Sequence, residues 1–509
     1  MFKATRAPIL ADRLKQQMAG VQLSSIQIQH SFPALPTPLQ TSSGSLEVAP
    51  LVIIGLRTSC GVVGESYLFS PNPSLIPALG EAIKAVFEVV SGDPCLPEDI
   101  TDKILKKFKL FGGTGILTMA MAAIDMAAWD VVGKTVGQPL YRVLGAKAKT
   151  VHSYESSGLG IGDLTSIRQQ ALRFMRAGNT TMKLRLGYAT LAEDLQALET
   201  LFQACGPTVQ VMVDYNQGLS PQEALTRCKA IDGHGLLWIE EPIHAELLEE
   251  TATLQAALKT PLQIGENLWS PTEFQRALRL SACQYIMPDV GKIGGVTQWL
   301  RAASVAEAYG VKVSSHLYPE ISSHLLAAIP NAHLLEYADW TANQFSGHTK
   351  PANNSLAVSD HAGFGLSVYR FGAAKLPQVR ARQQPSAGAV MVTLTPPMPS
   401  ITSSTTIPGL TGRAPKDVPQ AIRSPGFSVM SLDKSMTISC GVKIMSEAGY
   451  DWRSLPFTRT LIVSVAQSTS VSITGPTTPN PSKLLARVHC AKDGSACKTS
   501  SEVMSLMQV

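Results

Sequence analysis

The chain has 509 residues, of which 45% are hydrophobic and 16% charged, a composition typical of a globular protein with two or three domains. Its net charge of +5 arises after Lys375, where 13 Lys/Arg stand against 6 Asp/Glu, so the chain up to that point carries a net charge of −2. This distribution argues against a nucleic-acid-binding surface. No apolar run reaches the roughly 18–20 residues of a membrane span, so we expect no membrane contact.

Residues 1–22 are predicted to form an N-terminal extension. Four basic residues and one acidic residue lie in the first twenty positions, which leaves a mitochondrial transit signal as an alternative. The eight cysteines form no Cys-x-x-Cys pair, a pattern typical of reduced thiols, and we expect a cytoplasmic enzyme.

Two folded domains are predicted next. Residues 23–148 show strands that start near Leu23, Leu51 and Gly61 and then helices, including one around Ala120–Lys134, which indicates an α+β domain. Residues 149–340 repeat an apolar strand and an amphipathic helix at a regular spacing, and such units close most simply as an α/β (β/α)8 TIM barrel. A doubly wound open sheet is the alternative, although no Gly-rich turn follows an early strand.

The remainder of the chain changes in character. Residues 341–375 are predicted to return to the α+β domain. In residues 376–509, Ser, Thr and Pro make up about a third of the sequence without helical or strand periodicity. We expect this tail to be disordered, or to be the product of a faulty gene model.

Ionisable side chains end the predicted barrel strands. Lys183 and Arg185 end one strand, and acids or a histidine end the next six: Asp214, Glu240, Glu266, Asp289, His316 and Glu336. Counted from Lys183, the steps along the chain are 31, 26, 26, 23, 27 and 20. Each step is about one strand–helix unit, so a barrel would gather these groups at its C-terminal mouth. One such acid is usually a helix cap or a loop residue, but six consecutive units are not explained in that way.

Three of these acids predict a metal site. Asp214, Glu240 and Glu266 come from neighbouring strands and offer hard oxygen ligands, which suit Mg²⁺ rather than Zn²⁺. Asn216 offers a further carbonyl oxygen or orients a water, with a plain turn residue as the alternative.

The same segments resemble the mandelate racemase family of the enolase superfamily from about Leu23 to about Ala373. The likeness is carried by IDMAAWDVVGK from Ile124, MVDYNQ from Met212, WIEEP from Trp238, GEN from Gly265, PDVGKIGGVTQWLRA from Pro288 and SSHLYPEISSHLLAA from Ser314. The resemblance implies a capping domain on a modified (β/α)8 barrel and an assembly of several copies. It also implies the following residue roles: Asp214, Glu240 and Glu266 as Mg²⁺ ligands, Asp289 and His316 as an acid/base dyad, Glu336 as an acid beside the enediolate oxygen, and Lys183 as the first lysine of a K-x-K pair.

Such a set suits removal of the α-proton from a small hydroxy-carboxylate substrate. Mg²⁺ and Lys183 would stabilise the second negative charge on the carboxylate oxygens, and Asp289 would fix the tautomer of His316. We expect Glu336 to be protonated, with its pKa raised by burial, so that it donates a hydrogen bond. Ser156 is a candidate substrate contact.

Arg185 departs from the family pattern, in which a second lysine is the base opposite the histidine. Deprotonation at pH 7 costs roughly 4–5 kcal/mol for lysine and roughly 7.5–9 kcal/mol for arginine. A two-base racemase is therefore handicapped, and we predict a hydro-lyase that dehydrates a hydroxy or sugar acid. The alternatives are a 2-hydroxy-acid racemase or epimerase and a non-catalytic scaffold, while cycloisomerases use a lysine where this chain has Asp289.

Specificity is predicted to depend on a loop of the α+β domain around Pro33–Pro50. It offers Leu39, Ser43 and Leu46, and the one polar position among three hints at a hydrophilic substrate.

Overall fold

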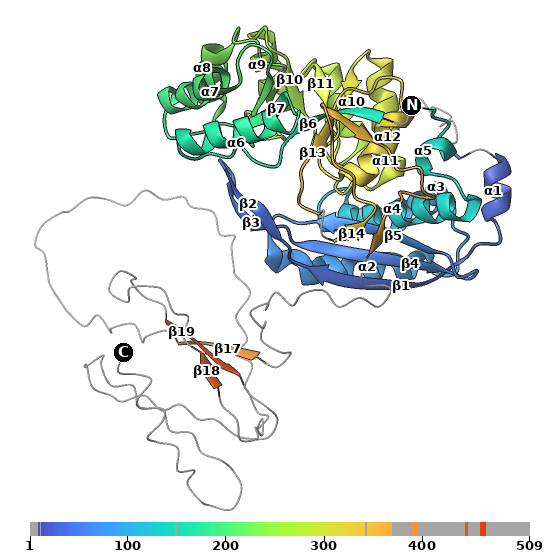
Figure 1. Cartoon of the computed structure of the whole chain (residues 1–509). Coiled ribbons are helices and arrows are strands. Elements are labelled where there is room, and N and C mark those ends of the chain that lie inside the picture. The colour runs from blue at the N-terminus through green and yellow to red at the C-terminus, as the bar shows by residue number, and fades with distance from the viewer. Residues whose placement is uncertain are drawn as a thin grey trace, which may run out of the picture. The chain divides into compact units, whose positions relative to one another are not determined.

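The computed structural model of the chain describes residues 9–10, 12–147, 150–341 and 344–368, and the segments 389–394, 443–445 and 459–464. The chain divides into two units, Met1–Lys375 and Leu376–Val509. In the second unit the described residues are three antiparallel strands in the order β17-β19-β18, which the sequence analysis did not predict (Figure 1). Their bounds are Ala389–Leu394 for β17, Lys443–Met445 for β18 and Arg459–Ser464 for β19. The rest of the tail that was predicted to be disordered lies outside the described residues.

The first unit begins with the α+β capping domain. Its main sheet is antiparallel with the order β1-β4-β5, and helices cover one face of it (Figure 1). The elements are α1 (Asp12–Met18), β1 (Leu23–Ser31), β4 (Leu51–Thr58), β5 (Val63–Phe69), the 3-10 turn η1 (Pro73–Leu75), α2 (Ile76–Val90), α3 (Pro97–Lys107), the 3-10 turn η2 (Lys109–Phe111), α4 (Ile116–Val136) and α5 (Leu140–Val143).

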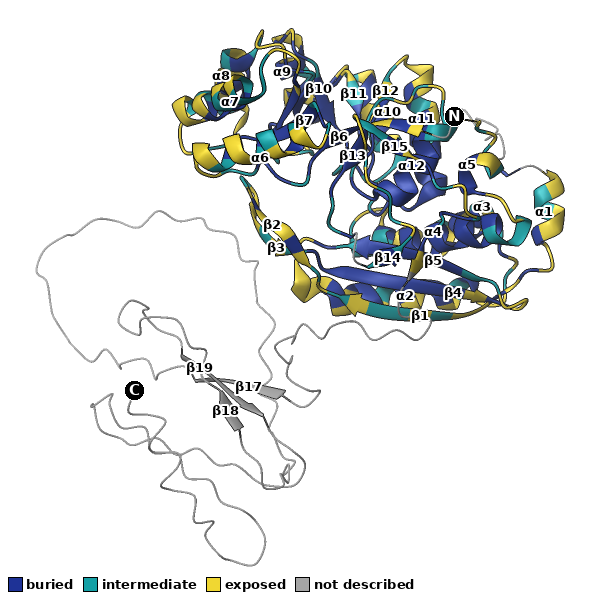
Figure 2. Ribbon diagram, viewed as in Figure 1, coloured by how far each residue is buried: buried dark blue, intermediate teal, exposed yellow. Residues whose placement is uncertain are grey.

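Helix α4 forms the core of the capping domain. It is rich in Ala and Met and ends where Gly137 takes a left-handed backbone conformation, with φ of 66°. Gly64 on β5 lets the helix approach closely, because a Cβ there would collide with the carbonyl oxygen of Ala127. The expectation that no apolar run could span a membrane was wrong, since α4 is long and apolar enough. However, 83% of its most apolar stretch is buried inside the chain, as in the core helix of a folded domain (Figure 2).

The predicted specificity loop is a β-hairpin. Strands β2 (Ala34–Thr41) and β3 (Gly44–Val48) pair antiparallel, with Leu39 opposite Leu46. The prediction of a loop was wrong because Pro36 and Pro38 obscure the strand pattern. A two-stranded hairpin has free edges, and there proline costs no ladder hydrogen bond.

The barrel sheet contains eight parallel strands in the order β6-β7-β8-β9-β10-β11-β12, with β13 beside β6 (Figure 1). Backbone hydrogen bonds from Val313 to Asn331, His333 to Val313 and Ser315 to Leu334 join the β12 segment to the chain that enters β13 and close the ring. The strands are β6 (Thr150–Glu155), β7 (Thr181–Arg185), β8 (Gln210–Asp214), β9 (Ile239–Glu240), β10 (Leu262–Ile264), β11 (Tyr285–Ile286), β12 (Lys312–Val313) and β13 (Leu335–Tyr337).

Seven helices connect these strands, in agreement with the predicted modified barrel. They are α6 (Leu164–Arg176), α7 (Leu191–Cys205), α8 (Pro221–Ile231), α9 (Leu248–Ala256), α10 (Pro271–Arg279), α11 (Val296–Ala308) and α12 (Pro319–Ala328). The described residues after β13 contain no eighth helix, and form the short strands β14 (Phe345–Ser346), β15 (Ser355–Ala357) and β16 (Ser367–Val368). Because the barrel strands are parallel, their C-terminal ends share one rim, where a barrel carries its active site.

Candidate active site

Lys183 lies at the centre of the barrel mouth and is 1% exposed. Its Nζ donates to Glu336 at 2.6 Å and to Glu240 at 2.8 Å, and it lies 3.2 Å from Asp214. Burial alone would lower the pKa of Lys183, but these carboxylates outweigh it and hold that pKa well above its ordinary value. The lysine is therefore a fixed cation within an acidic cluster.

His316 and Asp289 form the predicted pair. Nδ1 of His316 donates to Oδ2 of Asp289 at 2.6 Å, and the other Asp289 oxygen accepts the backbone N–H groups of Gly291 and Lys292. Nε2 of His316 lies 3.0 Å from Glu266 and 3.9 Å from Glu336. Although burial would lower the pKa of His316, Glu266 and Glu336 raise it well above its ordinary value. Asp289 thus fixes the imidazole and turns Nε2 toward the acidic cluster.

Glu336 does not fit the expectation of a protonated acid. Lys183 and the backbone N–H of Leu317, at 2.9 Å, stabilise its ionised form. Burial would raise the pKa of Glu336, but Lys183 and His316 outweigh it and lower that pKa to about 2. The prediction was wrong because the sequence can indicate that an acid is buried but not which cations lie beside it.

Asp214 and Glu240 end the adjacent strands β8 and β9, and Glu266 lies two residues after the end of the next strand, β10. In this structure Lys183 binds Asp214 and Glu240, while His316 binds Glu266. Among the described residues no group of three His, Cys, Asp or Glu side chains forms a ready-made metal cluster. The carboxylates therefore share one region without forming a finished coordination sphere.

Two observations test whether these residues fit a divalent cation. Oδ1 of Asn216 is buried without a hydrogen-bond partner in the described part of the chain, while its amide nitrogen donates to Asp214 at 2.9 Å. Glu240 is fully buried, and burial with the neighbouring Asp214 raises its pKa to about 8 despite the opposing effect of Lys183. An excess of buried oxygen donors and negative charge is the environment that a hard divalent cation requires, so the residues fit Mg²⁺.

Arg185 is bound to the protein itself. Its Nη1 donates to the carbonyl oxygens of Ser156 at 3.0 Å and Gly158 at 2.6 Å, and its Nη2 donates to the Ser156 hydroxyl at 2.8 Å. That hydroxyl donates to Glu336 at 2.8 Å, so Ser156 is a link between Arg185 and Glu336. The hydroxyl proton is therefore engaged by Glu336, and the predicted substrate contact of Ser156 stays a prediction.

The cap hairpin is docked on the barrel mouth by its serines. The hydroxyl of Ser42 donates to the backbone oxygen of Tyr215, and that of Ser43 donates to the backbone oxygen of Asn216 at 2.5 Å. Gly187 and Gly218 allow this approach, because a Cβ at either position would collide with Ser42. The hydroxyl of Ser43 thus attaches the hairpin to the barrel, and the hydrophilic substrate inferred from this position stays a prediction.

Known proteins resemble this chain over both domains. Residues 24–145 match the N-terminal domain model of the mandelate racemase/muconate lactonizing enzymes, and residues 166–371 match the enolase C-terminal domain-like model. The crystal structure of an enolase from alpha proteobacterium bal199 with bound Mg is 33% identical, with a TM-score of 0.67 over 69% of this chain and 98% of that one. The chain belongs to the enolase superfamily, and it is mandelate racemase-like.

Two further relatives within the superfamily carry functional information. A Bradyrhizobium enolase complexed with magnesium and mandelic acid is 31% identical, with a TM-score of 0.66 over 70% of this chain and 98% of that one. The L-talarate/galactarate dehydratase of Salmonella typhimurium is 28% identical over 359 residues, 69% of this chain and 89% of its own length.

The sequence analysis did not predict the residues that donate hydrogen bonds to the carboxylates of the site. Trp238 donates from Nε1 to Glu240 at 3.0 Å, and the Asn267 amide donates to Glu266 at 3.0 Å and to Glu241 at 2.7 Å. Nζ of Lys292 in turn donates to Asn267 at 2.8 Å. Trp238 was detectable, because a residue two positions before Glu240 on a strand points to the same face. The Asn267 and Lys292 contacts depend on the loops and had no comparable signal.

Proposed function

We propose that the chain is a Mg²⁺-dependent dehydratase of a small 2,3-dihydroxy carboxylate. The observation that carries this proposal is the engagement of Arg185 with Ser156 and Gly158, which leaves the His316–Asp289 pair as the proton-transfer group of the site. A one-sided site suits dehydration, whereas racemisation needs a second base on the opposite face. The similarity to L-talarate/galactarate dehydratase supports the same reaction class.

In the proposed reaction the base is the neutral form of His316, which Glu266 and Glu336 disfavour because they raise the pKa of this histidine. Its Nε2 accepts the proton from C2, and the electron pair of the broken C–H bond moves onto the carboxylate as an enediolate. Lys183 lies among the acids where that charge develops and stabilises it. The C3–O bond then breaks, and the same imidazole returns its proton to the departing hydroxyl as water. The enol that remains tautomerises to a 2-keto-3-deoxy acid, so atoms and charge balance.

Asp214, Glu240 and Glu266 would hold the magnesium ion, with the free Asn216 oxygen beside them. Bound there, Mg²⁺ supplies Lewis-acid stabilisation to the substrate carboxylate and 2-hydroxyl. Asp289 keeps Nδ1 of His316 protonated, so that Nε2 is the atom that exchanges the proton.

Incubation in deuterated water with a panel of hydroxy acids and Mg²⁺ tests this proposal. A 2-keto acid product from a 2,3-dihydroxy acid is the expected result. Loss of optical rotation without dehydration would instead indicate a racemase. Absence of both exchange and product on every acid would indicate a scaffold.

A further inference from the structure

We propose that Lys292 and Asn267 set the preference of the metal site for Mg²⁺ over the larger Ca²⁺. They are positioning residues, which hold Glu266 within the ligand set and Glu241 outside it. The inference rests on the proposed function only for the position of the metal ion among the carboxylates that follow β8, β9 and β10.

Glu241 is a buried acid at the barrel mouth that the proposed reaction does not use. It directly follows Glu240, and the two residues are 2% and 0% exposed. Consecutive residues on a strand point to opposite faces, but Glu241 has a φ of 32°, which ends that alternation. The mouth therefore holds a buried carboxylate that has no part in the proposed ligand set.

The side-chain amide of Asn267 bridges Glu241 and Glu266. Its nitrogen donates to Oε2 of Glu241 at 2.7 Å and to Oε1 of Glu266 at 3.0 Å, so the two carboxylates are neighbours. The other oxygen of Glu241 accepts the backbone N–H of Gly265 at 3.3 Å, so both oxygens of this acid are engaged by the protein. Glu266 instead turns Oε2 toward Nε2 of His316, 3.0 Å away, and keeps that oxygen on the side of the reacting groups.

Lys292 fixes which way the Asn267 amide points. Its Nζ donates to Oδ1 of Asn267 at 2.8 Å. Because an ammonium group only donates hydrogen bonds, it holds the amide oxygen toward itself and the amide nitrogen toward the two carboxylates. A flipped amide would place its oxygen against two negative charges and its nitrogen against the ammonium group. One lysine therefore determines, through the amide, how both glutamates are held.

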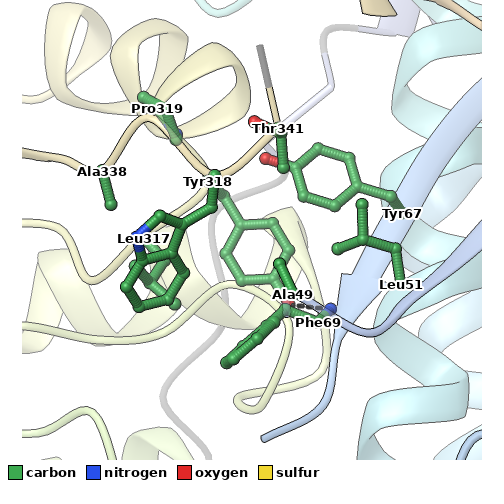
Figure 3. Close-up of a pocket in the computed structure, with 10 residues that line it drawn as sticks. Ala49, Leu51, Tyr67, Phe69, Leu317, Tyr318, Pro319, Ala338 and Thr341 are labelled. Carbon is green, nitrogen blue, oxygen red and sulfur yellow. Dashed lines mark hydrogen bonds between the residues drawn. The ribbon is translucent and has the colours of Figure 1, made fainter. Parts of the chain in front are cut away.

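The backbone of Lys292 is held in place by the loop that follows β11. Its N–H donates to Oδ1 of Asp289 at 2.9 Å, so the acid of the proton-transfer pair also positions Lys292. Tyr318 packs closely against the same loop, because a Cβ on Gly291 would collide with the tyrosine hydroxyl. That hydroxyl accepts the backbone N–H of Phe69, on β5 of the capping domain, at 3.0 Å (Figure 3). Lys292 thus projects from a loop that contacts on both sides keep in one conformation.

The two cations differ in the ligands that they require. Mg²⁺ takes about six oxygens in near-octahedral geometry at roughly 2.0–2.1 Å, whereas Ca²⁺ accepts about six to eight oxygens at roughly 2.3–2.6 Å in flexible arrangements. A mouth in which Glu266 is fixed and Glu241 is held away suits the smaller ion, whose geometry is stricter. Once the amide is released, Glu241 can turn toward the cation as a further oxygen donor, and the site then favours Ca²⁺.

Calorimetric titration of the full chain with Mg²⁺ and, separately, with Ca²⁺ tests the inference. In Lys292→Met we expect the ratio of Mg²⁺ affinity to Ca²⁺ affinity to fall about tenfold, as expected when a metal ligand loses its supporting contact. The ratio is the measure because removal of one positive charge changes the affinity for both divalent cations alike. Lys229→Met makes the same change at an exposed residue of α8 and should leave the ratio unchanged.

Further variants separate positioning from general damage to the fold. Lys292→Arg keeps a cationic donor for the amide oxygen and should retain the ratio within about threefold. Asn267→Ala should lower the ratio about tenfold, as Lys292→Met does, and it carries the test where Lys292→Met does not fold. Because Lys292 acts through Asn267, the double variant should be no worse than Asn267→Ala alone.

The outcomes separate this inference from the proposed function, since the titrations need no substrate. An unchanged ratio in Lys292→Met or Asn267→Ala overturns the inference, as do fully additive effects in the double variant, and dehydration by the parent chain then still supports the dehydratase proposal. The expected ratios in a parent chain that dehydrates no acid support the inference and overturn the dehydratase proposal. A parent chain that binds neither cation overturns both.

Discussion

The barrel mouth and the junction between α4 and α11 both bury polar groups, but they treat them differently. At the junction, Asp125 accepts hydrogen bonds from the hydroxyls of Thr101 at 2.7 Å and Thr297 at 2.6 Å, and from the backbone N–H of Thr297. Thr297 lies in the first turn of α11, so the acid caps that helix from α4. Every oxygen of Asp125 has a partner, and the network fixes α4 to both α3 and α11.

At the mouth, the buried groups are mostly charged and the backbone is strained. Lys183 lies within 3.2 Å of three carboxylates and His316 within 3.9 Å of three, and the two residues share Glu336. Asn216, Gln217, Glu241, Leu317 and Tyr318 all have positive φ, a conformation that costs about 1–3 kcal/mol for most side chains other than glycine. This chain thus keeps strain and unbalanced charge at the strand ends, where chemistry is proposed, and satisfied networks where the domains pack.

The strongest test of this contrast is His316→Asn at the mouth. Asparagine cannot carry the proton that the proposed reaction transfers, so we expect kcat for dehydration to fall about 10⁴-fold. The rate of 2-keto acid formation measures the loss, and Mg²⁺ affinity from calorimetry, expected to stay within threefold, is the control. Retention of more than a tenth of the activity would remove His316 from the mechanism.

At the junction, Asp125→Ala should lower the stability of the fold and leave the activity unchanged. It leaves the Thr297 N–H and two hydroxyls without their acceptor, so we expect the free energy of unfolding to fall by about 3 kcal/mol. Urea unfolding measures this change, and kcat below the transition should be unchanged. Glu81→Ala removes an exposed acid paired with Lys84 and should cost less than about 0.5 kcal/mol. Equal effects of the two variants would contradict the proposed capping role.

Arg185→Lys tests a position within the mouth itself. A lysine cannot bridge two carbonyl oxygens and the Ser156 hydroxyl at once, so we expect dehydration to slow about 100-fold through the misplaced Ser156–Glu336 link. We also expect loss of optical rotation with a 2-hydroxy acid that lacks a 3-hydroxyl, because a lysine can act as the second base. Arg173→Lys, on helix α6, is the matched control. A variant that dehydrates normally would show that Arg185 does not position the site.

The smallest effect concerns His324, which is buried beside the barrel away from the charged mouth. Its Nδ1 accepts the Tyr141 backbone N–H, its Nε2 donates to the Phe364 carbonyl, and burial lowers its pKa to about 4, despite Asp360 nearby. The unfolded chain binds a proton below about 6.5 and the folded chain only below about 4, so stability falls as pH drops through that window. The free energy of unfolding should be lower at pH 5 than at pH 7 by about 2 kcal/mol from this group.

Urea unfolding between pH 7 and pH 5 measures this slope. In His324→Asn the amide oxygen can still accept from Tyr141 but the side chain cannot titrate. The variant should therefore be less stable at pH 7, and over this range its stability should fall by about 2 kcal/mol less than that of the parent chain. An unchanged slope would show that other groups cause the acid sensitivity.

The capping domain, the barrel and the groups gathered at its mouth could all be predicted from the amino-acid sequence. Strand and helix periodicities are local, and parallel strands bring their ends to one rim whatever the loops do, so the regular steps from Lys183 to Glu336 were sufficient. The pairing of His316 with Asp289 was also predictable, because these residues end adjacent strands.

Which charges neighbour one another, and which polar groups are already bonded, depends on the tertiary fold. Glu336 is ionised because Lys183 lies 2.6 Å away, Arg185 is held by the carbonyls of Ser156 and Gly158, and Ser43 is engaged by Asn216. These contacts join partners far apart in the sequence through loop conformations that carry no periodic signal. The ionisation state and the hydrogen-bonding capacity of a side chain depend on atoms within a few ångströms, and folding alone brings those atoms together.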